Sequence, residues 1–215
     1  MKLFRFSFAI ALMLHMGFSF GQAKWTPQEI AKANTAKAAS FLSQDEREVI
    51  LYTNLARLNG NKFFDIHIKK FVAYQNATFS SKIKPKNKYL LSLQKDLSKI
   101  ANLPMIFPDT CLSKASKYHS KDMGRKGKIG HTSSNGKSFS KRVKGFCPKN
   151  MTIGENCSYG MDKAIWVVCQ LLVDDGISSV GHRINMLNPA YNICGVGVSE
   201  HKIYRTNCVI DYSRK

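Results

Sequence analysis

Hydrophobic positions recur at helical spacing in two stretches of the chain. In residues 43–58, Ser43 is followed three positions later by Glu46, the pattern of a capping box, and an apolar stripe continues behind it. Asp109 is placed to cap a second strong helix over residues 111–124. Both patterns predict amphipathic helices with one face against a core.

Other stretches complete the helical part of the prediction. Residues 63–74 and 90–100 favour helices, and the polar, lysine-rich residues 76–88 between them favour a surface loop. The segment between Asp162 and Asp175 is apolar nearly all round, which indicates a helix buried between two layers. Residues 125–160 are rich in Gly, Ser and Lys, so we expect mostly loop there.

The C-terminal part of the chain predicts strands. Residues 192–210 form two strand-like runs around a turn near His201. Helices followed by a terminal hairpin predict an α+β fold built in layers. The 215 residues suit one ordinary domain, and 44% hydrophobic against 22% charged residues exclude a disordered chain.

The start of the chain has the pattern of an export signal. Lys2 and Arg5 form a basic beginning, and residues 6–20 are almost entirely apolar. This run is shorter than the roughly 20 residues of a transmembrane helix. We predict cleavage after Gly21; cleavage after Ala23 and an uncleaved anchor are the alternatives.

This signal sets the predicted organisation and location. We expect a signal peptide at 1–21, an N-terminal linker at 22–43 and the folded domain at 44–215, in a protein that is secreted or periplasmic. No later stretch is apolar enough to cross a membrane. The formal net charge of +19 favours an anionic envelope, lipid or polysaccharide partner. Nucleic acid is disfavoured because the lysines are scattered without an aromatic-basic stripe.

The six cysteines predict disulfides, because an exported chain meets an oxidising environment and the count is even. The hairpin around residue 201 favours a bridge between Cys194 and Cys208. The simplest completion joins Cys147 to Cys157 and Cys111 to Cys169. No C-x-x-C pair is present, so a cysteine zinc ribbon is disfavoured.

Four polar residues are candidates for chemistry. Asp174 stands at the end of the apolar helix, where its charge opposes the helix dipole and calls for compensation. His182 would lie in the first turn of a short serine-capped helix, which favours the neutral imidazole that binds metals. His131 and Glu155 each stand beside a glycine in predicted loops. Together the four could converge on a divalent cation, with the acids orienting its bound water.

Each candidate also has a structural interpretation. His131 could be a loop residue, Glu155 a hydrogen-bonding turn residue, Asp174 a solvated helix end and His182 an anion contact. Among the other histidines, His119 is expected to be a partly buried structural residue, whereas His67 and His201 are expected at the surface.

Five short motifs, taken in order, resemble the CAP superfamily of cysteine-rich secretory proteins, venom allergens and plant pathogenesis-related proteins. The similarity covers about residues 44–213 and is greatest to the bacterial secreted branch. The motifs are Asn54-Leu-Ala-Arg57, Ala115-Ser-Lys-Tyr-His119-Ser-Lys-Asp-Met123, Gly130-His131-Thr132, Gly154-Glu155-Asn156 and Gly181-His182-Arg183-Ile-Asn185.

The resemblance implies a three-layer α-β-α sandwich with a central antiparallel sheet. It also implies a cavity in which His131 and His182 can hold zinc or another divalent cation, with Glu155 as one cavity acid. In place of the family's Trp-x-x-Glu helix, this chain has Leu171-Leu-Val-Asp174, so the second acid would be Asp174. Asn185 stands where many eukaryotic members carry a glutamine.

Two functions are compatible with these residues. The first is a secreted binding module whose cavity holds a divalent metal, a small apolar ligand or both. The alternative is a metal-assisted peptidase or esterase, with Glu155 as general base and Asp174 as orienting acid. Against the enzyme stands the lack of a recognisable nucleophile elbow or oxyanion hole.

Overall fold

The computed structural model describes residues 24–148 and 151–215, so the predicted signal peptide and its cleavage site lie outside the described residues. In the described part, no helix combines the length and the apolar character needed to cross a bilayer. The elements in chain order are α1 (Pro27–Ala33), α2 (Gln44–Leu58), α3 (Gly60–Phe63), a π-helical turn (Phe64–Ile68), α4 (Lys69–Thr78), α5 (Lys88–Leu97), β1 (Phe107–Pro108), α6 (Thr110–Lys126), α7 (Phe139–Val143), β2 (Ile153–Tyr159), α8 (Ala164–Val173), α9 (Gly181–Leu187), β3 (Ile193–His201) and β4 (Arg205–Ser213).

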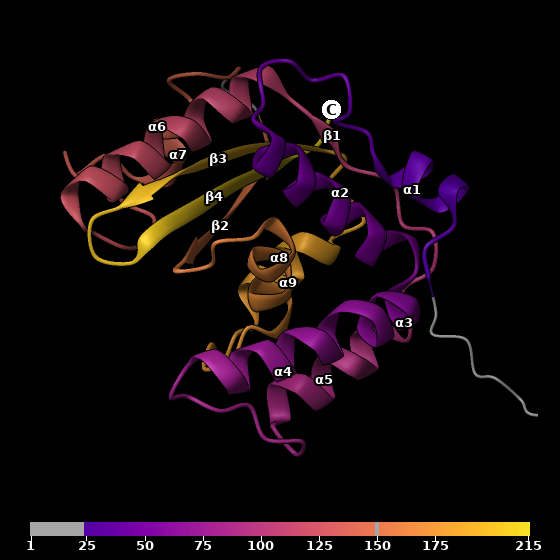
Figure 1. Ribbon diagram of the computed structural model, residues 1–215. Helices are drawn as coiled ribbons and strands as arrows, with labels where there is room; N and C mark the ends of the chain where they lie inside the picture. Colours follow the sequence, from indigo (N-terminus) through magenta and orange to yellow (C-terminus); the bar gives the residue numbers. More distant parts are fainter. Residues whose placement is uncertain (1–23, 149–150) are drawn as a thin grey trace, which may run out of the picture.

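The strands form one sheet in the order β1-β3-β4-β2, with helices on both faces (Figure 1). The α+β sandwich is therefore confirmed. The pairs β2–β4 and β3–β4 are antiparallel, but β1 runs parallel to β3. The sheet is thus mixed rather than purely antiparallel, because the two-residue β1 enters from the connection before α6 and not from a hairpin.

Helix α6 lies directly on one face of the sheet because β3 presents glycines to it. A Cβ on Gly195 would lie 2.0 Å from the Leu112 carbonyl carbon, and one on Gly197 would lie 2.5 Å from the Lys117 nitrogen. Only glycine permits so close an approach of α6 to β3. Helix α7 extends this layer, since Val143 packs with the buried side chains of α6.

The other face of the sheet carries the main core. Side chains at alternate positions of β3 and β4, including Val196 and Ile210, pack with α2 and α8, and α3, α4 and α5 pack further out. Burying each large aliphatic side chain contributes roughly 1.5–3 kcal/mol. Helix α8 is the buried helix predicted between Asp162 and Asp175.

The predicted helix ends are confirmed at α2 and α6. The Ser43 hydroxyl accepts from the Glu46 nitrogen at 3.3 Å, and the Glu46 carboxylate accepts from the Ser43 nitrogen at 2.8 Å. Asp109 caps α6 through the nitrogens of Cys111 and Leu112. These bonds satisfy backbone donors that a helix start leaves unpaired.

Two stretches differ from the prediction. The expected helix over 63–74 is longer, because α3, the π-helical turn and α4 run continuously from Gly60 to Thr78. The expected loop at 125–160 contains α7 and the whole of β2. In β2 five consecutive residues are buried, so it lacks the polar-apolar alternation by which a half-exposed strand is found.

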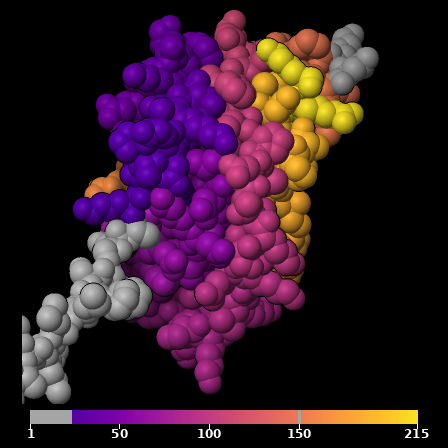
Figure 2. All heavy atoms as spheres, turned by 90° about the vertical axis from the view of Figure 1, so that its right-hand side faces the viewer, coloured from indigo at the N-terminus to yellow at the C-terminus, as the bar shows by residue number. Residues whose placement is uncertain are grey.

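The described part of the expected linker, residues 24–43, is packed against the domain. Helix α1 occupies its first half, and Ala33, Ala36 and Leu42 are buried in the main core. In Figure 2 the indigo segment at the start of the described chain lies against the rest of the molecule. Small alanine side chains allow this close packing, which composition alone does not reveal.

The cysteine pairing was predicted wrongly. The structure has a Cys111–Cys147 disulfide between α6 and the end of the α7 segment, and Cys157, Cys169, Cys194 and Cys208 are buried thiols. None of the three expected bridges, Cys194–Cys208, Cys147–Cys157 and Cys111–Cys169, is therefore formed. In the hairpin register Cys194 faces Tyr212 and Cys208 faces Val198. The two thiols thus lie four residues apart along the strands, roughly 13 Å, which exceeds disulfide reach.

Candidate functional site

The edge strand β2 brings the site together because successive residues point to opposite faces of the sheet. Glu155 lies opposite Asp211 of β4, which contacts Ser116 of α6, so Glu155 faces the α6 layer. Asn156 faces the other layer, where its Nδ2 donates to the His182 carbonyl oxygen at 2.9 Å. Candidate residues from both helical layers therefore meet at this edge.

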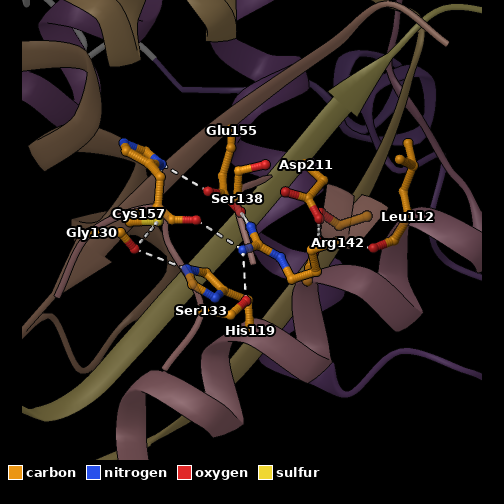
Figure 3. A network of polar contacts seen from close by, with 12 residues as sticks. Leu112, His119, Gly130, Ser133, Ser138, Arg142, Glu155, Cys157 and Asp211 are labelled. Carbon is orange, nitrogen blue, oxygen red and sulfur yellow. Dashed lines mark hydrogen bonds and ion pairs between the residues drawn. The ribbon is translucent and has the colours of Figure 1, made fainter. Parts of the chain in front are cut away.

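His131 and Glu155 form the first of two histidine-carboxylate pairs. The Nδ1 of His131 donates to Glu155 Oε1 at 2.8 Å. The carboxylate is 1% exposed, whereas the imidazole is 51% exposed. Glu155 is also paired with the buried guanidinium of Arg142, which donates in turn to the His131 carbonyl oxygen at 2.9 Å (Figure 3).

The pKa values of the two buried carboxyl groups of this layer, Glu155 and Asp211, are shifted in opposite directions. Burial alone would raise the pKa of Glu155, but the hydrogen bond from His131 and the charge of Arg142 outweigh burial and hold the pKa below its ordinary value. Burial and the neighbouring charge of Glu155 hold the pKa of Asp211 well above its ordinary value. Of the two carboxyl groups, Glu155 therefore favours the ionised form and Asp211 favours the protonated form.

His182 and Asp174 form the second pair. The Nδ1 of His182 donates to Asp174 Oδ1 at 2.7 Å, and the His182 backbone nitrogen donates to Asp174 Oδ2 at 3.0 Å. Asp174 ends α8 in the left-handed conformation, with φ 56°, which turns its carboxylate toward the start of α9. This is the compensation that the sequence called for, since the carboxylate meets the positive end of α9.

The predicted serine cap of the short helix is wrong. Val180 occupies that position in the left-handed conformation and offers no side-chain hydrogen bond. Asp174, from the preceding helix, accepts from the first backbone nitrogens of α9 instead. His182 does lie in the first turn, as predicted.

Arg183 fixes the position of this pair. Its buried guanidinium donates to the carbonyl oxygens of Leu172 at 2.8 Å and Val173 at 3.0 Å, the last turn of α8. It also pairs with Asp96 of α5 at 2.9 Å. One cation thus satisfies carbonyls that a helix end leaves free and joins α5, α8 and α9.

Both imidazoles line one cavity of about 510 Å³. Tyr159 and Cys157 of β2 also line the cavity, whereas Glu155 lies behind His131 and outside the lining. The rest of the wall is largely apolar and is made by Phe71, Ile83, Ile129, Leu171, Val173 and Ile177. The structure therefore brings together all four predicted residues: His131, His182 and Asp174 line the cavity, and Glu155 lies behind His131.

The donor set suits a cation with an open coordination sphere. Each Nδ1 is held by a carboxylate, and within residues 24–148 and 151–215 no protein atom hydrogen-bonds to either Nε2. An imidazole oriented this way presents a free Nε2 lone pair, the usual arrangement behind a metal-binding histidine. In the described residues, no group of three or more mutually close His, Cys, Asp or Glu donors contains both rings, so other coordination positions would fall to water or ligand.

A buried cluster beside the site was not foreseen. Donor atoms of His119, Glu155 and Cys157 lie within 4.8 Å of one another. Burial lowers the pKa of His119, and its Nε2 donates to the Gly130 carbonyl oxygen at 2.9 Å (Figure 3). His119 is structural as expected, but it is fully buried rather than partly buried. By this bond it holds the Gly130-His131 segment beside β2.

The other two histidines were wrongly expected at the surface. His201 is buried at the end of β3, where its Nε2 bonds to the Lys128 carbonyl oxygen. His67 is half-buried and accepts from the Trp25 indole nitrogen at 2.9 Å. Residues far away in sequence cover both rings, so local polarity could not indicate their burial.

The fold and the site define an α-β-α sandwich protein with paired histidines and acids at the open edge of its sheet. The chain belongs to the cysteine-rich secretory protein family, abbreviated CAP, whose sequence model matches residues 52–212. A search of the curated proteins found no match.

Three solved bacterial structures are similar to the chain. An extracellular protein containing an SCP domain from Bacillus anthracis is 23% identical, with a TM-score of 0.45, over 63% of this chain and 45% of that chain. An outer surface protein from Borrelia burgdorferi is 18% identical, with a TM-score of 0.44, over 64% of this chain and 99% of that one. A cysteine-rich secretory protein from Staphylococcus aureus is 15% identical, with a TM-score of 0.37, over 63% and 42%. The match thus spans less than half of the Bacillus and Staphylococcus proteins.

Proposed function

We propose that this protein is an exported binding module whose cavity holds a divalent cation, such as zinc, through His131 and His182. The observation that carries the proposal is that two imidazoles from opposite layers line one cavity, each with Nδ1 on a buried carboxylate. When bound, the cation would supply a positively charged Lewis-acidic centre for a polar ligand group. Glu155 and Asp174 fix the ring orientations and the tautomer of each histidine.

The apolar wall supports a second part of the same function. Phe71, Leu171 and Val173 line the cavity beside the histidines, and about 510 Å³ is the size of a small-molecule site. A ligand with a polar end near the histidines and an apolar body along this wall would match both the histidines and the apolar part of the cavity. We therefore infer a small amphipathic ligand.

The contacts favour binding over hydrolysis. A general base must reach the water that it deprotonates. Glu155 lies outside the cavity lining and is already engaged by His131 and Arg142. Asp174 is engaged by His182 through both carboxylate oxygens. Both acids therefore serve as positioning residues in this proposal.

We also propose that the protein acts outside the cytoplasm and contacts anionic material there. The basic and apolar beginning of the sequence supports export, and the formal net charge of +19 supports attraction to lipid or polysaccharide anions.

Titration calorimetry with zinc tests the cation site. Wild-type protein should bind one equivalent, and His131→Ala and His182→Ala should each lower the affinity about tenfold or more. His67→Gln is the control, because this histidine lies outside the cavity. Wild-type affinity in both alanine variants, or no binding to wild type, would contradict the proposal.

A further inference from the structure

The turn between β3 and β4 lies beside the C-terminal end of α6 (Figure 1). The Lys202 nitrogen donates to the Gly124 carbonyl oxygen at 3.0 Å. We call residues 125–129 and 202–205 the hairpin tip. Two segments that are distant in sequence thus form one projecting end of the sandwich.

His201 fixes the shape of the hairpin tip. Its Nδ1 accepts from the nitrogens of Ile203 at 3.2 Å and Tyr204 at 3.1 Å. Because Nδ1 is an acceptor in both bonds, the ring proton is on Nε2, which donates to the Lys128 carbonyl oxygen at 2.9 Å. One buried imidazole therefore ties the two segments together.

Large apolar side chains are exposed to solvent at the hairpin tip. Ile203 is 66% exposed and Ile129 is 59% exposed, the two highest values for large hydrophobic residues in the described chain. Tyr204 beside them is 43% exposed. Exposed apolar groups gathered on a rigid projection are typical of a contact surface.

Basic side chains surround these apolar residues. The hairpin tip has five exposed cations, none of which forms an ion pair within the described residues, and Glu200 is the one acid between residues 199 and 206. The five are Arg125, Lys126, Lys128, Lys202 and Arg205. Cations around projecting aliphatic and aromatic side chains match the headgroup and acyl layers of an anionic bilayer. An anionic polysaccharide would pair with the cations but would leave the isoleucines in water.

The hairpin tip also borders the cavity. Ile129 belongs to both, and the ring of Tyr159, another cavity residue, lies 5.8 Å from the ring of Tyr204. We propose that the hairpin tip docks this protein on anionic lipid bilayers, with the cavity mouth next to the membrane surface. This inference rests on the proposed contact with anionic material, to which it gives a place and a chemical class.

Vesicle sedimentation tests this proposal with protein collected after export. Wild type should bind vesicles of phosphatidylcholine with 30% phosphatidylglycerol, and binding should fall as salt rises. Lys126→Glu/Lys202→Glu should lower the partition coefficient at least about tenfold, since each surface cation contributes to attraction by the anionic lipid. Ile203→Ser should lower it about fivefold through lost apolar burial.

Matched variants elsewhere supply the controls. Lys84→Glu/Lys86→Glu changes the charge equally in the exposed loop before α5, and Ile184→Ser removes an isoleucine that is 57% exposed in α9. Both should bind vesicles nearly as wild type does. Equal losses in tip and control variants, or binding of a charged polysaccharide but not of vesicles, would overturn the docking proposal. Zinc titration of the same preparations measures the cavity independently, so failure of one proposal is distinguishable from failure of the other.

Discussion

Single buried polar residues hold the connections that build the site. Asn54 of α2 donates to the carbonyl oxygens of Ala33 and Ile106 and accepts from the Ile106 nitrogen at 2.8 Å. Arg57, one turn later, donates to the carbonyl oxygens of Pro104, Met186, Asn188 and Tyr191. These side chains replace the backbone partners that loops lack, so Asn54 and Arg57, two motif residues outside the cavity, have a structural role.

Asp174→Asn should weaken zinc binding at His182. An amide in this place carries no charge to support the imidazole and holds its tautomer less firmly, and loss of such an outer partner typically costs about 10–100-fold in affinity. Calorimetry on the variant measures this loss. Thermal unfolding provides the control, because the amide oxygen can still accept from the start of α9. Unchanged zinc affinity in the folded variant would contradict the positioning role.

At the scale of elements, the histidines and acids could be predicted but the polar network behind them could not. His131, Glu155 and His182 stand beside glycines in short motifs that the sequence displays. Arg142 carries no local signal, since it follows a serine-rich stretch and reaches Glu155 only through the fold. Strand β2 was missed for a related reason, because burial on both faces removes the alternation that marks a strand.

Gly195→Ala tests the contact between α6 and β3. The added Cβ would meet the backbone of Leu112, which cannot move away as a side chain could, so overpacking should lower the free energy of unfolding by about 2–3 kcal/mol. Urea unfolding measures this change. Gly181→Ala is the matched control, because a Cβ there meets only the Ser179 hydroxyl at 3.4 Å. Equal stability of the two variants would show that α6 does not depend on the glycine.

His67, in the π-helical turn, should make the free energy of unfolding depend on pH. Burial, reinforced by Lys70, lowers the pKa of His67 from 6.5 to about 4, so the folded state favours the neutral ring that accepts from Trp25. The unfolded chain therefore binds more protons between these pH values, and stability should fall as pH decreases from 6.5 to 4. The loss should be about 1–2 kcal/mol after solvent screening. Urea unfolding should show a smaller loss for His67→Gln; identical slopes would exclude His67 as the cause.

At the scale of the whole molecule, the folded arrangement determines which cysteines form a disulfide and which remain thiols. The α+β layering could be predicted because helix and hairpin patterns are local. The pairing could not, because a disulfide depends on which residues face each other after folding. Cys111 and Cys147 join α6 to the α7 segment, and the other four cysteines are buried thiols, of which Cys157 also lines the cavity.

Denaturing alkylation followed by mass spectrometry counts these thiols. The exported protein should take up four adducts without reduction, one each at Cys157, Cys169, Cys194 and Cys208, and six after reduction. Replacing Cys111 and Cys147 with serine should lower stability by about 3–4 kcal/mol, because the bridge closes a long loop in the unfolded chain. Fewer than four adducts before reduction would mean additional bridges.

In the proposed site, both layers of the sandwich deliver an imidazole to one cation. Anomalous diffraction from a zinc-soaked crystal locates that cation. We expect a single strong peak in the cavity, about 2.0–2.1 Å from Nε2 of both His131 and His182. A peak bonded to only one of these rings, or no peak in the cavity at saturating zinc, would contradict the shared site.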